Sequence, residues 1–135
     1  MACRLAKAVQ IALSRLGDPY SQELRGQQNY TDCSYLVLWV YRQLGINLPG
    51  TAAEQGKYCV SKGLEISSSS LEPGDLVFWS YEPNGCYLNI THVGIYAGDG
   101  KVVDASSSHG EVMYRNLFDA NKQVLYARPY ADKEK

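Results

Sequence analysis

Several features that mark familiar classes of protein are missing from this sequence. Lys and Arg number 13 against 14 Asp and Glu in 135 residues, which gives a formal net charge of −1. Nucleic-acid binders and polybasic membrane anchors need a clustered surplus of positive charge, so this balance argues against both. No apolar run approaches the roughly 20 residues that span a bilayer. The content of 45% apolar and 20% charged residues is instead typical of a single globular domain.

Cysteine is also sparse, and its spacing does not suit a metal site. Cys3, Cys33, Cys59 and Cys86 are separated by 30, 26 and 27 positions and form no C-x-x-C pair. This spacing argues against a zinc site. No other metal and no cofactor is expected either. Two disulfides are possible by count, but no pattern supports them, and free thiols are the expectation. Cys59 falls in a predicted helix and is expected in the core, whereas Cys86 falls in a loop and is expected to be exposed.

The two ends of the chain carry little structural information. Residues 1–5 are not followed by the apolar stretch and small-residue cleavage site that mark a signal peptide, so none is expected. The protein then either stays in the cytoplasm, leaves by another route or is part of a longer chain. Residues 131–135 are mostly charged and are expected to form a solvated tail or the start of a linker, which leaves residues 1–130 as one domain.

Hydrophobic periodicity predicts helices in the first half of the chain and strands in the second. Thr51 and Glu54 fit a capping box for the third helix, in which each satisfies the other's free backbone amide. Helices before strands favour an α+β domain, with N-terminal helices packed on a C-terminal antiparallel sheet. Three helices are expected, over residues 3–16, from residue 31 or 32 to residue 44, and over residues 52–62. The expected strands are 76–79, 92–97, 101–105, 112–114 and 124–128.

Cys33 is the first candidate for a chemical role. It follows Asp32, which can cap a helix, and therefore falls in the first turn of the second helix. Free amides and the helix dipole favour a thiolate at such a place, and the thiolate is the nucleophilic form of cysteine. The alternative is a small buried core residue, which is the usual role of a free cysteine.

A nucleophilic cysteine needs a base, and the chain offers two histidines. His92 opens a predicted strand. His109 lies in a tract rich in serine, residues 106–110, which would hold an imidazole loosely. Asp104, in the strand after His92, is the candidate for the third group that orients the imidazole ring.

The hairpin between these two strands decides whether Asp104 can reach His92. A three-residue loop at 98–100 places Ala97 opposite Lys101. Asp104 then lies on the same face as His92, one diagonal step away and within reach of the two side chains. A two-residue loop would shift the register by one and turn Asp104 to the other face.

Five short motifs occur in an order that is familiar from one family. Each motif alone is weak, but together they extend over residues 5–129, nearly the whole chain. The sequence resembles the NlpC-type cell-wall cysteine peptidases, which have a compact papain-like fold. The motifs are Asp32-Cys33-Ser34, Leu48-Pro49 with Thr51-Ala52-Ala53-Glu54-Gln55, Pro73-Gly74-Asp75-Leu76-Val77-Phe78, His92-Val93-Gly94-Ile95-Tyr96 and Val102-Val103-Asp104-Ala105-Ser106.

The resemblance implies a cysteine endopeptidase that hydrolyses an amide bond in the peptide stems of bacterial peptidoglycan, often next to D-glutamate and a diamino acid. Cys33 matches the nucleophile, His92 the base and Asp104 the residue that orients the imidazole. The third position is commonly His in the family. A carboxylate there can orient the ring and stabilise its cation, and it would raise the pKa of His92 and shift the pH optimum upward.

The resemblance also implies residues for substrate binding. Tyr20 matches a residue that borders the nucleophile and holds substrate or helps to form the oxyanion hole. Asp32 and Ser34 match positions that bind the free amine of the stem peptide, although Asp32 is equally well explained as a helix cap. Tyr35 stands where the family commonly has Gly, so its ring is expected to reshape the helix packing or the groove. The long segment 81–91 is expected to form one wall of that groove.

Other functions would use the same fold. An N-acetylmuramoyl-L-alanine amidase would cut the lactyl–L-alanine amide with the same three residues. A wall-binding module would keep the fold without turnover, and an intracellular amide hydrolase or transferase would suit a chain without a signal peptide. We expect a monomer whose partner is the peptidoglycan stem peptide, with no nucleic acid and no membrane span. It would act at the bacterial cell wall, as a secreted or phage-delivered protein or as a domain of a longer one.

Overall fold

The predicted order of elements is confirmed. The computed structural model describes residues 2–130, with side chains from residue 7 onward, so the expected tail at 131–135 and the Cys3 side chain lie outside the described residues. Within 2–130, helices precede strands throughout. The elements are α1 (Ala2–Leu13), α2 (Cys33–Gln43), α3 (Ala52–Ser61), β1 (Leu76–Trp79), β2 (His92–Gly98), β3 (Lys101–Ser106), β4 (Glu111–Asn116) and β5 (Gln123–Ala127), with short 3₁₀ turns η1 (Ser68–Ser70), η2 (Tyr87–Asn89) and η3 (Ala120–Lys122).

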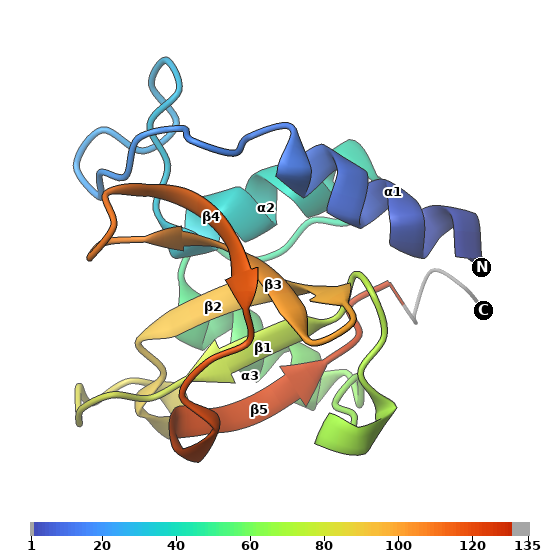
Figure 1. Ribbon diagram of the computed structural model, residues 1–135. Helices are drawn as coiled ribbons and strands as arrows, with labels where there is room; N and C mark the ends of the chain where they lie inside the picture. The colour runs from blue at the N-terminus through green and yellow to red at the C-terminus, as the bar shows by residue number, and fades with distance from the viewer. Residues whose placement is uncertain (1, 131–135) are drawn as a thin grey trace.

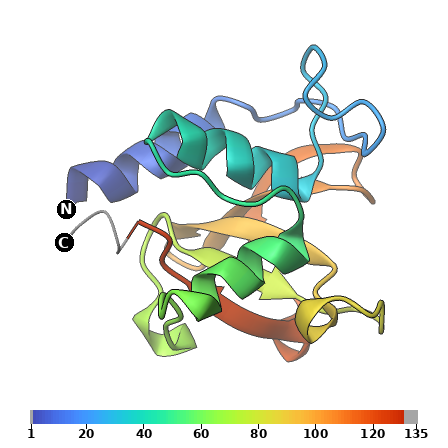
Figure 2. The ribbon, with the colours of Figure 1, turned by 180° about the vertical axis from the view of Figure 1, so that it is seen from behind.

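The described strands form an antiparallel sheet in the order β4-β3-β2-β1-β5. After β4 at one edge of the sheet, the chain crosses to the other edge, where β5 pairs with β1. Helices α1 and α2 lie above the sheet in Figure 1, and α3 crosses behind β1 and β5, as the reverse view in Figure 2 makes clear. This is the predicted α+β architecture, with N-terminal helices packed on a C-terminal antiparallel sheet.

The main core lies between the helices and one face of the sheet. Successive strand residues point to opposite faces, so each strand supplies alternate side chains to this core. Leu76 and Phe78 of β1 pack with the helices, whereas Val77 and Trp79 join a smaller cluster with Val102 on the other face. Burial of these apolar side chains is the main force that holds the two layers together.

The same alternation assigns a face to the two candidate residues of the sheet. Val93 and Val103 pack in the main core with the helices. Their chain neighbours His92 and Asp104 therefore project from the opposite face. The ring of His92 lies there beside that of Trp79, with 5.2 Å between the ring centroids.

Helix α1 is shorter than its apolar pattern predicts, because it ends at Leu13 rather than Leu16. The Ser14 hydroxyl donates to the carbonyl of Ile11 at 2.5 Å, and the next amides bond three residues back instead of four. These bonds tighten the chain into a turn. Leu16 is consequently exposed instead of facing the core, and Gly17, at φ +85°, completes the turn.

The other two helices begin at predicted caps. The Asp32 side chain accepts from the amide of Tyr35 at 2.8 Å and caps α2. Thr51 caps α3 by accepting from the amide of Glu54 at 3.2 Å. The second half of the predicted capping box differs, because the Glu54 carboxylate accepts from the Thr51 hydroxyl at 3.1 Å in place of the backbone amide.

The β2–β3 hairpin reaches the expected register by an unexpected route. Gly98 pairs with Lys101 in place of the predicted Ala97, so the loop has two residues and not three. An irregularity at Ala97 then shifts the register by one residue, and the pairs beyond it follow the predicted alignment. Without that shift, the two-residue loop would have turned Asp104 away from His92.

The described thiols lie where the pattern predicts. Cys59 is fully buried in α3 and Cys86 is exposed, and both are free, as is Cys33. Burial raises the pKa of the Cys59 thiol to about 12, which makes it chemically inert at ordinary pH. Of the helices described, none is long and apolar enough to cross a membrane.

Candidate active site

Cys33 is the first residue of helix α2 and lies beside His92 of the sheet. Asp32 caps the helix immediately before it. Cys33 is only 8% exposed, and its thiol lies near enough to the imidazole of His92 to contribute to the raised pKa of that ring. The first amides of a helix have no partner within the helix, so they are free to donate to a group bound at this end of α2. Cys33 also belongs to the main core cluster, and its position beside His92 is what distinguishes it from a cysteine that only packs.

His92 and Asp104 form a close polar pair. The Nε2 atom of His92 lies 2.8 Å from Oδ2 of Asp104. The carboxylate is fully buried, and the His92 side chain is 16% exposed. Because Nε2 faces the carboxylate, Nδ1 is the ring nitrogen left for Cys33. The structure thus brings together the three predicted catalytic residues, which come from α2, β2 and β3.

The electrostatics of the pair favour a charged imidazole and a charged carboxylate. Burial lowers the pKa of His92, but its hydrogen bonds to Asp104 and Cys33 outweigh this effect and raise the pKa from 6.5 to about 9. Burial raises the pKa of Asp104, but the hydrogen bonds and positive charges of His92 and Arg115 hold it below its usual range. The direction of the His92 shift is the one expected for a carboxylate at the third position.

Arg115 on β4 is a partner of Asp104 that the sequence analysis missed. Its Nε donates to Oδ1 at 3.0 Å and its Nη2 to Oδ2 at 2.6 Å. The strand predicted at 112–114 stops short of it, whereas β4 continues to Asn116. In the sheet Asp104 faces Met113, so Arg115, two residues further on, shares its face. A longer predicted strand would have revealed the contact.

Tyr20 stands at the entrance to the site. Its amide donates to the carbonyl of Gly110 at 2.9 Å, and its backbone pairs with Thr31, just before α2. Burial, together with the negative charges of Cys33 and Asp32, raises the pKa of Tyr20 to about 12. The hydroxyl therefore stays protonated near neutral pH and is available as a hydrogen-bond donor next to the thiol.

Asp32 and Ser34, on either side of the cysteine, are already bonded to a residue that the sequence analysis did not single out. The Arg25 guanidinium donates from Nη1 to Oδ2 of Asp32 at 3.0 Å and to Oγ of Ser34 at 3.1 Å, and from Nη2 to the carbonyl of Gly50 at 2.8 Å. The capping role of Asp32 is confirmed. Its second oxygen is occupied by a cation of the protein itself, so an incoming amine would share or displace Arg25.

Tyr35, the departure from the family pattern, packs beneath that arginine. The guanidinium of Arg25 lies over its ring, 5.4 Å from the centroid. A Cβ on Gly26 would come within 3.2 Å of the same ring, so the chain at Gly26 lies directly against it. The ring therefore supports the loop that carries Arg25, residues 18–30.

Two adjoining pockets flank the thiol and the imidazole, and Thr91 lines both of them. The predicted wall, residues 81–91, contributes to each, and Tyr81 is tied down by donating to Asp119 at 2.6 Å. We call them the His92 pocket and the Cys33 pocket. The first is lined by Tyr20, Tyr81, His92, Ser106, Arg115 and Phe118, and the second by Arg25, Asp32, Cys33, Ser34, Asn84 and Cys86, among others.

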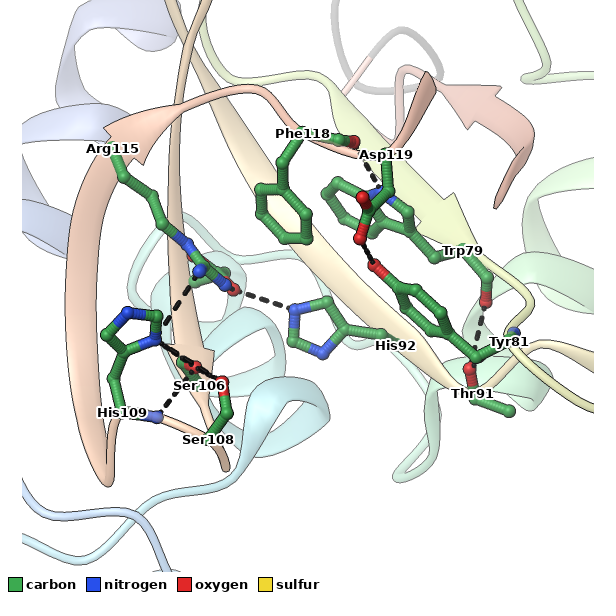
Figure 3. A network of polar contacts seen from close by, with 11 residues as sticks. Trp79, Tyr81, Thr91, His92, Ser106, Ser108, His109, Arg115, Phe118 and Asp119 are labelled. Carbon is green, nitrogen blue, oxygen red and sulfur yellow. Dashed lines mark hydrogen bonds and ion pairs between the residues drawn. The ribbon is translucent and has the colours of Figure 1, made fainter. Parts of the chain in front are cut away.

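The second histidine is held in the β3–β4 turn. Its Nδ1 lies 3.0 Å from Oγ of Ser106 and 3.3 Å from Oγ of Ser108. His109 is therefore held more firmly than the serine-rich tract predicts. Figure 3 shows it on the far side of the Arg115 guanidinium from His92. Among residues 2–130, no cluster of three or more His, Cys, Asp or Glu side chains is arranged to hold a metal ion.

A cysteine at a helix N-terminus that faces a histidine on an antiparallel sheet defines a compact, papain-like α+β domain. The sequence model of the NlpC/P60 family matches residues 17–128, which is well over half of the chain. The chain belongs to this family. It is 38% identical over 97 residues to the probable endopeptidase p60 of Listeria grayi, a match that covers 72% of this chain and 17% of that protein.

Solved structures of the family share the fold. The NlpC/p60 domain of the peptidoglycan hydrolase SagA superposes with a TM-score of 0.72 and 26% identity, over 92% of this chain and 97% of that one. RipD of Mycobacterium tuberculosis, a non-catalytic NlpC/p60 domain protein adapted to peptidoglycan binding, superposes with a TM-score of 0.73 and 20% identity, over 92% and 95%. The chain spans less than half the length of the first curated relatives that it matches.

Proposed function

We propose that this chain is a cysteine endopeptidase domain that hydrolyses an amide bond in the peptide stems of peptidoglycan. The observation that carries the proposal is the position of Cys33 beside His92, whose Nε2 lies 2.8 Å from Oδ2 of Asp104. A thiol at a helix N-terminus, an imidazole and a carboxylate that orients it are the parts that thiol-based acyl transfer requires. Membership of the NlpC/P60 family and the likeness to the peptidoglycan hydrolase SagA support this choice of substrate.

The reaction starts from the Cys33 thiolate and the protonated His92. The thiolate attacks the carbonyl carbon of the scissile amide, and the carbonyl oxygen becomes an oxyanion. As the C–N bond breaks, His92 gives its proton to the leaving amine, and a thioester remains on Cys33. The neutral imidazole then takes a proton from a water molecule, whose oxygen attacks the thioester carbon. The peptide leaves as a carboxylic acid, and the thiolate and imidazolium are restored.

Neighbouring groups of the site have roles in these steps. The backbone amide of Cys33, at the helix N-terminus, and the Tyr20 hydroxyl are the proposed donors to the oxyanion. Asp104 holds the imidazole ring and stabilises its cation. Asp32 and Ser34 line the Cys33 pocket and are proposed to contact the stem peptide there. An extended peptide would cross from the Cys33 pocket to the His92 pocket past Thr91.

Digestion of purified peptidoglycan by the wild type and by Cys33→Ala, followed by mass spectrometry, tests the proposal. We expect new stem-peptide fragments from the wild type and none from the variant. Matched thermal unfolding of the two proteins would show that the variant is folded. Fragment masses identify the bond, because an amidase would release intact stems at the lactyl–L-alanine amide. Equal fragments from both proteins would refute cysteine catalysis.

A non-catalytic peptidoglycan-binding role is the second candidate, and the fold shared with RipD favours it. Sedimentation with insoluble peptidoglycan separates the two functions. Binding by the wild type without any fragments, over a wide pH range and several wall types, would decide for the binding module. Neither binding nor fragments would leave the intracellular amide hydrolase as the better explanation.

A further inference from the structure

Asp104 has a second cationic partner that the proposed mechanism does not use. Arg115 reaches the carboxylate with two donors, Nε to Oδ1 at 3.0 Å and Nη2 to Oδ2 at 2.6 Å. Nε2 of His92 lies 2.8 Å from the same Oδ2. In Figure 3 the side chains of Arg115 and His92 point toward one another. One carboxylate oxygen is therefore shared between a guanidinium and an imidazole.

The guanidinium is itself held in place by an aromatic platform. Its carbon lies 4.0 Å from the centroid of the Phe118 ring, which stacks on Trp79 with 4.6 Å between centroids. The carbonyl of Phe118 accepts from Nε1 of Trp79 at 2.9 Å and from Nε2 of Gln123 at 2.8 Å. The Arg115 side chain is only 23% exposed. This is a built contact rather than a loose ion pair at the surface, which would contribute little.

The carboxylate needs such a partner because it has no access to water. Asp104 is fully buried, and a buried charge is costly unless it is paired and hydrogen-bonded. A Cβ on Gly94 of the neighbouring strand would lie 3.1 Å from Cβ of Asp104, so the space around the side chain is tight. Two parallel N–H donors from one guanidinium fix the plane of a carboxylate better than a single bond does.

We propose that Arg115 is a positioning residue of the active site, which keeps the Asp104 carboxylate aimed at His92 and draws part of its negative charge away from the imidazole. The inference rests on the proposed function, in which His92 gives a proton to the leaving amine and later takes one from water. An unshared carboxylate would hold the proton on the imidazole too firmly for the first transfer. A misaligned one would leave the ring without orientation.

Other titratable groups face this pair from the neighbouring elements. Among the described residues, Arg115 and His92 are the positively charged partners of Asp104. His109 is near but makes only a long contact with Nη1 of Arg115, at 3.5 Å. The remaining groups are Cys33 from α2, Tyr20 from the segment before it, and Tyr81, Glu82 and Asp119 from the loops around the His92 pocket.

A titration of the His92 imidazole by NMR tests the proposal without any substrate, and the chain has only two histidines to resolve. Arg115→Gln should raise the titration midpoint by about one pH unit, because it removes a positive charge next to the imidazolium. Asp104→Asn should lower the midpoint by at least about one unit. Arg115→Lys should stay near the wild type. Lys101→Gln, which removes an exposed positive charge that bonds to β4, is the matched control and should change nothing.

Opposite shifts in the two variants are the discriminating result, since a purely structural role would move both midpoints toward that of a free histidine. A fall in both, or no change in Arg115→Gln, would overturn the proposal. Should Arg115→Gln not fold, as thermal unfolding would show, Arg115→Met, which also removes the positive charge, carries the same test through the same expected rise in midpoint.

The kinetics of peptidoglycan cleavage supply a second readout. We expect kcat of Arg115→Gln to fall about tenfold with KM within about twofold of the wild type, and its pH optimum to move upward. Arg115→Lys, which keeps the charge but cannot form the two parallel bonds, should recover only part of kcat. If the wild type cuts no peptidoglycan at all, the proposed function fails, whereas the imidazole titration still decides the role of Arg115.

Discussion

Replacing Asp104 with Asn should change how the stability of the protein depends on pH. Hydrogen bonds to Asp104 and Cys33 outweigh the effect of burial and raise the pKa of His92 from 6.5 to about 9. A group with a higher pKa in the folded chain binds its proton more tightly there, so it stabilises the fold while it is protonated. This contribution is fully present below about pH 6.5 and is lost as the pH rises through about 9.

The expected size follows from the gap between the two pKa values. At about 1.4 kcal/mol per unit, a shift from 6.5 to about 9 corresponds to about 3 kcal/mol of unfolding free energy. The neutral amide of Asn at position 104 cannot hold the imidazolium in this way. The pKa of His92 should therefore fall back toward 6.5, and most of the pH-dependent loss should disappear.

Urea unfolding measured from about pH 6 to about pH 10 would give the free energy of unfolding of both proteins. The wild type should lose about 2 kcal/mol more than Asp104→Asn over this range, because Cys33 supplies the rest of the shift. Asp99→Asn is the matched control, because it removes an exposed carboxylate at the tip of the same hairpin. Parallel curves for the wild type and Asp104→Asn would refute the assigned coupling between the carboxylate and the imidazole.

Two further predictions concern packing and thiol chemistry. Gly94→Ala should lower the unfolding free energy by about 1–3 kcal/mol, because the new Cβ would lie within 3.1 Å of two side-chain atoms of β3. A thermal unfolding midpoint equal to that of the wild type would contradict this crowding. Alkylation of the folded protein by iodoacetamide, mapped by mass spectrometry, should label the exposed Cys86 and spare the buried Cys59, whose pKa is raised to about 12. Equal labelling of the two would argue against the described burial.

The sequence was sufficient to predict the layers of the fold and to name the three residues that lie together at the candidate site. Apolar periodicity depends on which face of an element is buried, and that property is local to each helix and strand. Cys33 and His92 each stand at the first residue of an element, next to a recognisable boundary signal. Asp104 could be placed because strand pairing relates its position to His92 by simple counting.

What the sequence could not predict depends on contacts between distant segments. Arg115 meets Asp104 only because β4 extends past its apolar part and pairs with β3 in one particular register. Arg25 reaches Asp32 and Ser34 from an irregular loop whose path has no periodic signal. Charged side chains at strand ends and in loops carry no pattern of burial, so their partners become visible only in three dimensions.

Local side-chain bonds explain the smaller errors. The hydroxyl of Ser14 competes with the helix for a backbone carbonyl and ends α1 early. The irregularity at Ala97 corrects the register that a two-residue loop would otherwise impose. Both features involve a single residue, and neither changes the apolar pattern on which the strand and helix boundaries were based.

The proposed nucleophile and its proposed base belong to different layers of the molecule. Cys33 comes from helix α2, whereas His92 and Asp104 project from the face of the sheet opposite the helices. The thiol and the imidazole therefore meet where the end of the helix passes the end of the sheet. The distance between the two groups is therefore set by how α2 packs against the sheet, and a substitution in that shared core can change it without touching either residue.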